Sequence, residues 1–311
     1  MRSGMLYSSR NDRTSTAAAQ IELDSNITAF VLTARTQHLR PVADAPALSE
    51  SGGELLRDIE VLDESGERRK LQIPLERPLT VGIDGQELVT LMTLGAKPEL
   101  LVLGYLRNQR IIETVAEIKS IEVDFEAGRA LVVRRTEVAQ AQAPRFNGSA
   151  CSLGTEFSEV MRQVDSAPPL QDGVRITRAQ LLRILDITRE YDAIHRAAGS
   201  VHGCALFQGD EMLLSLEDVS RHNGLDTVVG WMLLHGVGGA DKTLFTTGRL
   251  TGEMVMKAAH NGISIMVSRN GVTSMGYELA ARLGMVLFGR AAKGRYLCYV
   301  GTERFDSASA P

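Results

Sequence analysis

The chain is poor in cysteine. Its 311 residues include three, Cys151, Cys204 and Cys298, which lie far apart and show no short metal-ligand spacing. The wide separation of the three cysteines argues against both a disulfide framework and a zinc knuckle. Reduced thiols fit the cytosol, so we expect a cytoplasmic protein with no resident metal.

Long hydrophobic runs are also missing. The longest apolar stretch, residues 228–240, is rich in glycine, contains His235 and is too short to span a bilayer. Residues 1–20 lack the continuous apolar core of a secretory signal, and we expect them to form a disordered leader. The sequence therefore predicts no membrane insertion.

Acidic residues slightly outnumber basic ones overall, but positive charge gathers near the C-terminus. The formal net charge of −4 argues against a protein that coats nucleic acid or an anionic membrane. Residues 245–311 contain eight Lys/Arg and four Asp/Glu, a net of +4, so the preceding 244 residues carry −8. A phosphate-bearing ligand would therefore be drawn to the C-terminal region.

Elements of both kinds are indicated along the chain, which predicts a mixed α/β (α+β) fold. With 44% apolar residues the chain can bury one large core or two modest ones, and we expect two lobes. The first, residues 21–138, combines a hairpin at 79–94, a helix at 99–108 and strands at 118–133. Within it, the polar and acidic segment 43–67 resembles a surface insertion.

The second lobe, residues 171–311, follows a linker at 139–170. A helix is expected at 177–198 with Thr177 as its N-cap, followed by strands at 201–207 and 212–216. Asp218 or Ser220 would cap the next helix, which runs toward His235. The β-α-β-α-β alternation between 244 and 289 predicts a sheet covered by helices and largely parallel in this part.

Cys151 is the sharpest candidate for chemistry. It lies in a Gly/Ser-rich stretch, where a thiol is accessible and mobile enough to carry a sulfur atom between two sites. The alternative is that this cysteine is only a small tolerated residue. Cys204 and Cys298 sit in apolar, strand-like patterns, so we expect both to be buried in the core.

A second candidate is the polar run Glu217–Asn223, which follows a predicted strand and includes Asp218, Arg221 and His222. Ligand sites in open α/β sheets collect at strand ends, where a helix N-terminus offers free N–H groups to anions. The plainer interpretation is a charged helix start with internal ion pairs. His202 either lines the same cleft or is a satisfied core histidine.

A third candidate is a basic turn between two predicted strands, whose glycine permits close backbone approach and whose cations could clamp phosphate. It consists of Arg290, Ala291, Ala292, Lys293, Gly294 and Arg295. Thr247-Gly248-Arg249 has the same character. Most short basic turns are solvated hairpin tips, and that alternative stays open here.

Several of these motifs, taken in order, resemble the FdhD/NarQ family of formate dehydrogenase accessory sulfurtransferases. The resemblance spans residues 71–305, and its second half is the more specific. The matching segments are Val201-His202-Gly203, Arg221–Asp226, Thr247-Gly248-Arg249 and Val267–Glu278.

The resemblance implies a cytosolic homodimer that accepts persulfide sulfur from a cysteine desulfurase. It would pass this sulfur to the molybdenum bis-molybdopterin guanine dinucleotide cofactor, its bound substrate, before the cofactor enters apo formate dehydrogenase. The second lobe is expected to be similar to the cytidine deaminase fold. Deaminase zinc chemistry is excluded, because no His-x-Glu is followed by Pro-Cys-x-x-Cys. The basic turn at 290–295 would hold the cofactor.

The sequence departs from the family at the thiol loop. Where the family commonly carries Cys-Gly-x-Cys-Gly, this chain has Cys151-Ser152-Leu153-Gly154-Thr155. One nucleophile suffices to hold a persulfide, but a resolving partner for internal disulfide chemistry is absent from this loop. Sulfur transfer thus stands beside a second hypothesis, a diverged relative that only binds the cofactor.

Three functional hypotheses result. In the first, Cys151 carries the sulfur, Arg221 or Arg249 and the basic turn grip cofactor phosphates, and His222 or His202 manages protons. In the second, a non-catalytic chaperone binds the pterin nucleotide or a dehydrogenase subunit. In the third, which we rank lowest, a nucleotide-processing enzyme uses Glu217, Asp218 and His222.

Overall fold

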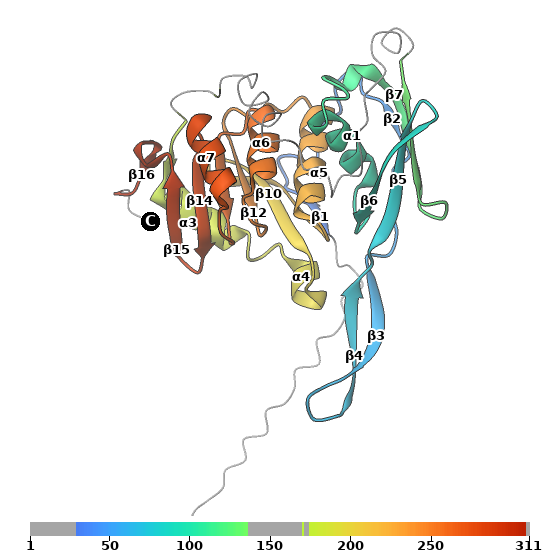
Figure 1. Cartoon of the computed structure of the whole chain (residues 1–311), viewed down its shortest axis with the longest axis horizontal. Coiled ribbons are helices and arrows are strands. Elements are labelled where there is room, and N and C mark those ends of the chain that lie inside the picture. The colour runs from blue at the N-terminus through green and yellow to red at the C-terminus, as the bar shows by residue number, and fades with distance from the viewer. Residues whose placement is uncertain (1–28, 136–169, 171–173, 309–311) are drawn as a thin grey trace, which may run out of the picture.

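Two β-sheets with helices packed on and between them make up the fold. The computed structural model describes residues 29–135, 170 and 174–308. Figure 1 shows the larger sheet, with its helices, on one side of the molecule and the smaller sheet on the other. The mixed α/β class predicted from the sequence is confirmed.

The larger sheet has seven strands in the order β1-β11-β10-β12-β13-β14-β15. Strands β12, β13 and β14 run parallel to one another, as the alternation of elements predicted, while the other pairs of this sheet are antiparallel. The strand bounds are β1 Phe30–Leu32, β10 His202–Gln208, β11 Glu211–Asp218, β12 Lys242–Thr246, β13 Ile265–Ser268, β14 Val286–Ala292 and β15 Arg295–Val300.

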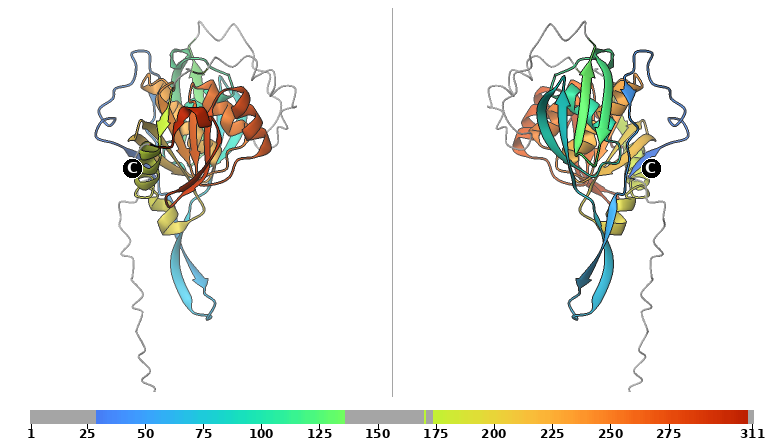
Figure 2. Two further views of the ribbon diagram at one scale, coloured as in Figure 1. Left: turned by 90° about the vertical axis from the view of Figure 1, so that its left-hand side faces the viewer. Right: turned by 90° about the vertical axis from the view of Figure 1, so that its right-hand side faces the viewer.

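Helices cover both faces of this sheet. Alternate residues of a strand point to opposite faces, so Leu244 joins one apolar core and Phe245 the other. Helices α5, α6 and α7 lie on the first face and α3 on the second, as the two side views in Figure 2 show. The helix bounds are α3 Arg178–Ile187, α4 Ala193–Ala198, α5 Arg221–Leu234, α6 Gly252–His260 and α7 Ser274–Arg282.

The smaller sheet has five strands in the order β2-β7-β8-β5-β6, and helix α1 (Pro98–Asn108) packs against it. Its β5–β6 hairpin turns at Asp84 and Gly85, which both have positive φ (47° and 84°), the conformation that suits a two-residue hairpin turn. The predicted hairpin and helix are therefore confirmed. The strand bounds are β2 Ala47–Leu48, β5 Arg77–Ile83, β6 Gln86–Thr93, β7 Ile118–Asp124 and β8 Arg129–Arg134.

Helices α1 and α5 join the two sheets through backbone contact. A Cβ atom placed on Gly104 would lie 1.7 Å from the carbonyl oxygen of Asp226, and one on Gly230 would lie 1.9 Å from that of Leu100. Because glycine removes the side chain at both crossing points, the helices approach closely and one continuous apolar core spans both sheets. The two predicted lobes thus share a core.

Shorter elements complete the fold. Strands β3 (Leu56–Leu62) and β4 (Arg68–Pro74) form a ribbon that projects from the body in Figure 1. The segment 43–67, predicted to be a surface insertion, thus contains strands β2 and β3. Acidic side chains at exposed positions of β3 made its strand pattern hard to recognise in the sequence. The remaining elements are β9 Ile176–Thr177, β16 Phe305–Asp306, and the 3₁₀ turns η1 Val115–Glu117 and η2 Thr302–Arg304.

The helix predicted at 177–198 is wrong in its extent, because it is divided into α3 and α4. Thr177 does cap α3, and its side chain accepts a hydrogen bond from the backbone N–H of Gln180 at 3.1 Å. The start of α4 depends on a residue that is distant in the sequence. Glu217 accepts the N–H groups of Ile194 and His195 at 2.7 and 2.9 Å. A carboxylate from another element therefore begins α4.

Some predictions fall outside this description. The leader at 1–20 and all of the 139–170 linker except residue 170 lie outside the described residues. The cytidine-deaminase-like character of the larger sheet stays a prediction. None of the helices described is long and apolar enough to cross a membrane.

The α1–α5 contact can be tested by Gly104→Ala. Alanine favours an isolated helix by up to about 1 kcal/mol over glycine, yet here its methyl group would enter the backbone of α5. We expect the free energy of unfolding, measured by urea titration, to fall by about 2 kcal/mol or more. Gly52→Ala, with no atom within 4 Å of the new methyl group, is the control and should change stability by less than about 0.5 kcal/mol. Equal stabilities for the two variants would contradict this packing.

Candidate functional site

Several strand ends meet at one edge of the larger sheet. Strand β10 begins at His202, which lies opposite Asp218 at the end of β11, and Cys204 lies opposite Thr246 at the end of β12. Helix α5 starts immediately after β11. The polar segments singled out in the sequence at 202, 217–223 and 247–249 are therefore brought together here.

Backbone contacts set the shape of this edge. Ser220 caps α5 by accepting the N–H of His222 at 3.3 Å. The Arg221 side chain crosses Gly248, where a Cβ atom would lie 2.6 Å from the Cβ of Arg221. Thr247 closes the other side, since its hydroxyl accepts the N–H of Gly203 at 3.0 Å. Because Gly248 has no side chain, the Arg221 side chain can cross the backbone at this point.

His202 is half-buried at this edge, with its Nδ1 atom 3.4 Å from the Thr247 hydroxyl. Burial lowers its pKa below the ordinary value, and the nearby charges of Arg221, His195 and Arg249 lower it further. The ring therefore faces a positive environment. Of the two interpretations drawn from the sequence, a residue that lines a shared site describes His202 better than a satisfied core histidine.

His222 lies beside His202 and Arg221. Its pKa is lowered to about 4 by burial first, and then by Lys257 and Arg221, against the opposing effect of Asp226. Its Nδ1 atom is 3.4 Å from a carboxylate oxygen of Glu253 but lacks the alignment of a hydrogen bond. The imidazole is consequently neutral near pH 7.

The two carboxylates next to His222 in sequence face away from it. Glu217 is occupied by the N-terminus of α4, and buried Asp218 accepts from the Thr93 hydroxyl at 2.6 Å and from Asn223 at 2.8 Å. Burial raises the pKa of both carboxyls. These groups hold elements together, so the geometry does not supply the Glu217, Asp218 and His222 cluster that a nucleotide-processing enzyme would need.

A buried ion pair lies behind the edge. Lys257 donates to both carboxylate oxygens of Asp226 at 2.9 Å, and Asn108 of α1 donates to the same carboxylate at 2.6 Å. Lys257 also lies 3.6 Å from Glu253, the neighbour of His222. The charge of Lys257 is thereby fixed close to the imidazole whose pKa it lowers.

The basic turn extends the same edge. Its β14 segment continues past the end of β13, and the N–H of Arg290 donates to the carbonyl of Asn270 at 2.7 Å. Asn270 in turn donates to the carbonyl of Thr247 at 3.2 Å, which ties the hairpin to the 247–249 loop. We call His202, Arg221, His222, Arg249 and Arg290 the cationic edge.

Within the turn, the residues differ in what they present. The turn proper is Lys293 and Gly294, both with positive φ (51° and 75°). The side chains of Arg290, Lys293 and Arg295 are exposed, as are Ala292 and Gly294. Ala291 is fully buried, so any contact that it makes with a ligand would have to come from its backbone.

Two of the three thiols are placed by the structure. Cys204 is buried, as predicted, and burial raises its pKa to about 12. Cys298 is half-buried rather than in the core, because it lies on β15 at the end of the sheet, and burial raises its pKa as well. Cys151 lies outside the described residues. No group of three or more His, Cys, Asp or Glu in the described ranges could hold a metal ion.

The cationic edge therefore offers arginine side chains, neutral imidazoles and loop N–H groups in one place. Such a surface can bind phosphate groups and take up a proton next to them. The pKa values of both cysteines placed by the structure are raised, so neither favours the thiolate form.

Comparison with known proteins identifies the group to which this architecture belongs. The FdhD/NarQ family matches residues 74–306. The chain belongs to the FdhD/NarQ family. This confirms the resemblance drawn from residues 71–305.

Individual relatives agree. The sulfur carrier protein FdhD of Geobacillus kaustophilus (strain HTA426) is 32% identical over 221 residues, which cover 70% of this chain and 84% of the relative. That of Bacillus subtilis (strain 168) is 30% identical over 246 residues, covering 78% and 94%. A crystal structure described as a formate dehydrogenase accessory protein from Desulfotalea psychrophila has a TM-score of 0.67 at 26% identity, covering 80% of this chain and 98% of that one.

Sequence reasoning missed three residues of the site: Glu253, Lys257 and Asn270. Asn270 lies within the family segment 267–278 but was not singled out there, since its role depends on two loops meeting. Lys257 did leave a sequence signal, because it is a charged residue among the buried Met254, Val255 and Ala258 of α6. A lysine within an apolar helical stripe indicates a buried partner.

The protonation of His222 gives a testable result. Its pKa is about 4 in the folded chain and 6.5 without the protein environment, so the unfolded state binds more protons between these values. The contribution of this group to stability is therefore complete above pH 6.5 and declines as the pH falls toward 4. We expect NMR titration to place the ring's midpoint near pH 4, and His222→Asn to weaken the loss of stability over this range. A midpoint near 6.5 would contradict the described environment.

Proposed function

We propose that this protein is a sulfur carrier that serves formate dehydrogenase, with Cys151 as the residue that carries the sulfur atom. Membership of the FdhD/NarQ family supports the role, because relatives of similar length are described as sulfur carriers. The proposed donor is a cysteine desulfurase, and the proposed recipient is the molybdenum bis-molybdopterin guanine dinucleotide cofactor as bound substrate.

The chemistry of the three thiols supports Cys151 by elimination. A sulfur carrier reacts as a thiolate, which requires a thiol pKa that is not raised and access to a partner protein. Cys204 is buried with a pKa of about 12, and the pKa of Cys298 is also raised. Cys151 is the remaining cysteine of the chain.

The first proposed step is an exchange without net oxidation. The Cys151 thiolate attacks the terminal sulfur of the donor's persulfide, a new S–S bond forms at Cys151, and the donor cysteine leaves as thiolate. Delivery of that sulfur as sulfide then takes two electrons. Because Gly154 stands where the family commonly carries its second cysteine, no thiol of this loop can resolve the persulfide, and the proposed source of the two electrons is a small thiol.

The cationic edge is the proposed holding site for the cofactor. Its phosphates would lie against Arg221, Arg249 and the 290–295 hairpin, where the exposed cations can approach them. The neutral imidazoles of His202 and His222 would accept protons released near the exchanging sulfurs. This placement rests on the geometry and charge of the edge.

The cellular compartment and the oligomeric state are proposed on the same basis. A persulfide carrier needs reduced thiols, which fits the cytoplasm. A homodimer and direct docking to apo formate dehydrogenase also remain proposals.

The carrier role is tested by intact-protein mass spectrometry after incubation with a cysteine desulfurase, its pyridoxal cofactor and cysteine. We expect wild type to gain about one sulfur mass, reversed by reductant, and Cys151→Ala to gain none, because only the thiolate can attack the donor. Cys298→Ala is the matched control and should behave as wild type.

An adduct that persists in Cys151→Ala would contradict the assignment of that thiol. No adduct in wild type, with a donor shown to be active on another acceptor, would contradict sulfur transfer. The chaperone hypothesis would then be preferred, since it needs the cationic edge and not the thiol.

The cofactor site is tested separately with a guanosine diphosphate, which has the base and diphosphate of the proposed cargo. Charge reversal of Lys293 and Arg295 to Glu should weaken its binding, measured by calorimetry, by about tenfold or more, equivalent to about 1.4 kcal/mol. The same reversal at exposed Arg57 and Lys70, on the distant β3–β4 ribbon, is the control. Equal affinities for the two double variants would contradict the placement at the hairpin.

A further inference from the structure

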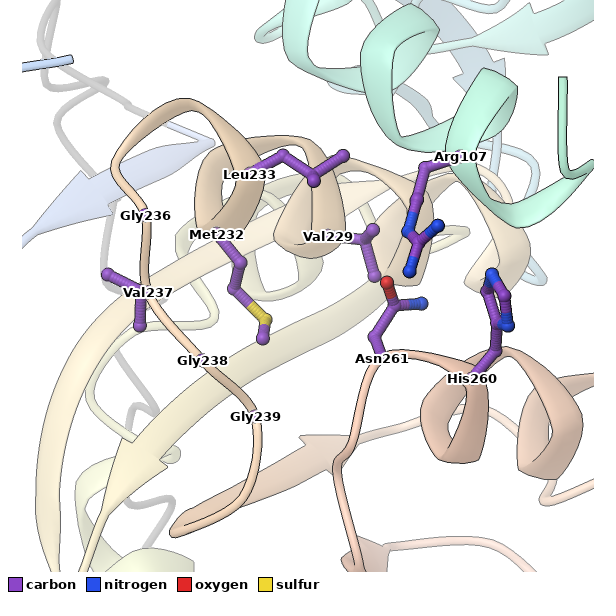
Figure 3. A pocket seen from close by; sticks show the side chains of 10 residues that line it. All are labelled: Arg107, Val229, Met232, Leu233, Gly236, Val237, Gly238, Gly239, His260 and Asn261. Atoms are coloured by element: carbon purple, nitrogen blue, oxygen red, sulfur yellow. The ribbon is translucent and has the colours of Figure 1, made fainter. Parts of the chain in front are cut away.

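A pocket of about 280 Å³ lies at the opposite end of α5 from the cationic edge. Since α5 has 14 residues, the two places are separated by about 20 Å. Figure 3 shows Arg107 reaching from α1 toward Asn261 and His260 at the end of α6, with Val229 and Met232 of α5 beside them. Three helix ends thus enclose this pocket.

The polar atoms that line it are left without partners. Both ring nitrogens of His260 and the Nε atom of Arg107 are buried and have no hydrogen-bond partner in the described part of the chain. Buried polar atoms are nearly always hydrogen-bonded, because leaving one unpaired costs about 1–3 kcal/mol. Three such atoms at one pocket indicate that something polar completes their bonding.

The electrostatic field at the pocket is positive. The pKa of His260 is lowered to about 4 by burial first, then by Arg107 and Arg110, with Glu113 opposing them. Two cations therefore outweigh one carboxylate, and the neutral ring at pH 7 keeps one N–H to donate. This combination of donors favours an anionic acceptor.

Compensation of helix dipoles is the simpler explanation for basic residues here. Arg107 and His260 both lie in the last turns of their helices, where cations stabilise the C-terminus. Residues with that role donate to the exposed carbonyls. Arg107 donates instead to Glu113, and neither nitrogen of His260 bonds to any residue that the structure describes. Dipole compensation thus leaves their orientation unexplained.

The rest of the pocket is apolar and firmly held. A Cβ atom on Gly239 would lie 2.1 Å from the carbonyl oxygen of Asn261, so the loop after α5 rests directly on the end of α6. Asn261 is fixed in turn by its hydrogen bonds to Asn108 at 2.7 Å and to the carbonyl of Lys257 at 2.8 Å. Val229 is fully buried beneath the pocket, and Met232 and half-buried Leu233 supply apolar surface to a preformed space.

We propose that this pocket binds a small organic oxyanion, a carboxylate or a phosphate carried on an apolar group. The oxyanion accepts from Arg107 and His260, and the apolar group lies on Met232 and Leu233. The inference is independent of sulfur transfer, because it rests on a separate pocket and is measured by binding alone.

The test uses benzoate and phenyl phosphate as the two oxyanion probes and benzyl alcohol as the uncharged control. We expect one or both oxyanions to bind with a Kd on the order of 1 mM, typical of a fragment-sized ligand, and to move the His260 titration midpoint upward. The relative affinity of the two probes identifies carboxylate or phosphate as the preferred group. Benzyl alcohol should bind at least about tenfold more weakly, since it lacks the charge.

Two arginine variants locate the binding. Arg107→Gln should weaken oxyanion binding by about tenfold or more, whereas Arg110→Gln removes an equal charge outside the lining and should weaken it by about twofold. Unchanged circular dichroism verifies the fold. If Arg107→Gln fails to fold, His260→Phe, which keeps a ring and removes both nitrogens, carries the same test.

Three results would overturn the proposal. They are no binding of either oxyanion up to about 50 mM, equal binding of benzyl alcohol, and unchanged affinity in a folded Arg107→Gln variant. The first would leave water as the partner of these side chains, and the second would make the pocket merely apolar.

Discussion

Asp226 joins the two halves of this protein through both its backbone and its side chain. Its carbonyl lies where α1 and α5 cross at Gly104, and its carboxylate accepts from Lys257 of α6 and Asn108 of α1. A buried carboxylate is tolerated because its charge is paired and its oxygens are hydrogen-bonded. Three helices are thereby fixed relative to one another, and the edge at one end of α5 and the pocket at its other end both depend on that arrangement.

The engagement of carboxylates within the fold also explains the charge of the cationic edge. Glu217 begins α4, Asp218 connects β6 to the start of α5, and Asp226 holds Lys257, so the acidic residues near the edge are largely engaged in the fold. What faces outward is therefore arginine and neutral imidazole. A surface of this kind suits a ligand that brings its own negative charge.

Thiol chemistry complements that surface. The two cysteines placed in the larger sheet have raised pKa values because burial disfavours the thiolate, which lowers the share of the reactive form at neutral pH. In the proposed function, the reactive chemistry is assigned to Cys151 and ligand binding to the cationic edge. Separation of the two tasks is physically reasonable, since a carrier thiol must reach a donor protein while a cofactor site must stay rigid.

The sequence by itself determined the local elements and the family. The Asp84-Gly85 hairpin, the Thr177 cap and the alternation around β12, β13 and β14 depend on neighbouring residues, and the ordered motifs from 201 to 278 identified the FdhD/NarQ relationship. Only the tertiary structure decided which charges are available. Asp218 meets Thr93, and Asp226 meets Asn108, across more than a hundred residues, and such partners together with burial set whether a carboxylate supports the fold or faces a ligand. The division of 177–198 into two helices has the same cause, because the carboxylate that starts α4 comes from β11. Burial and pairing arise from the packed whole, and a local pattern cannot encode them.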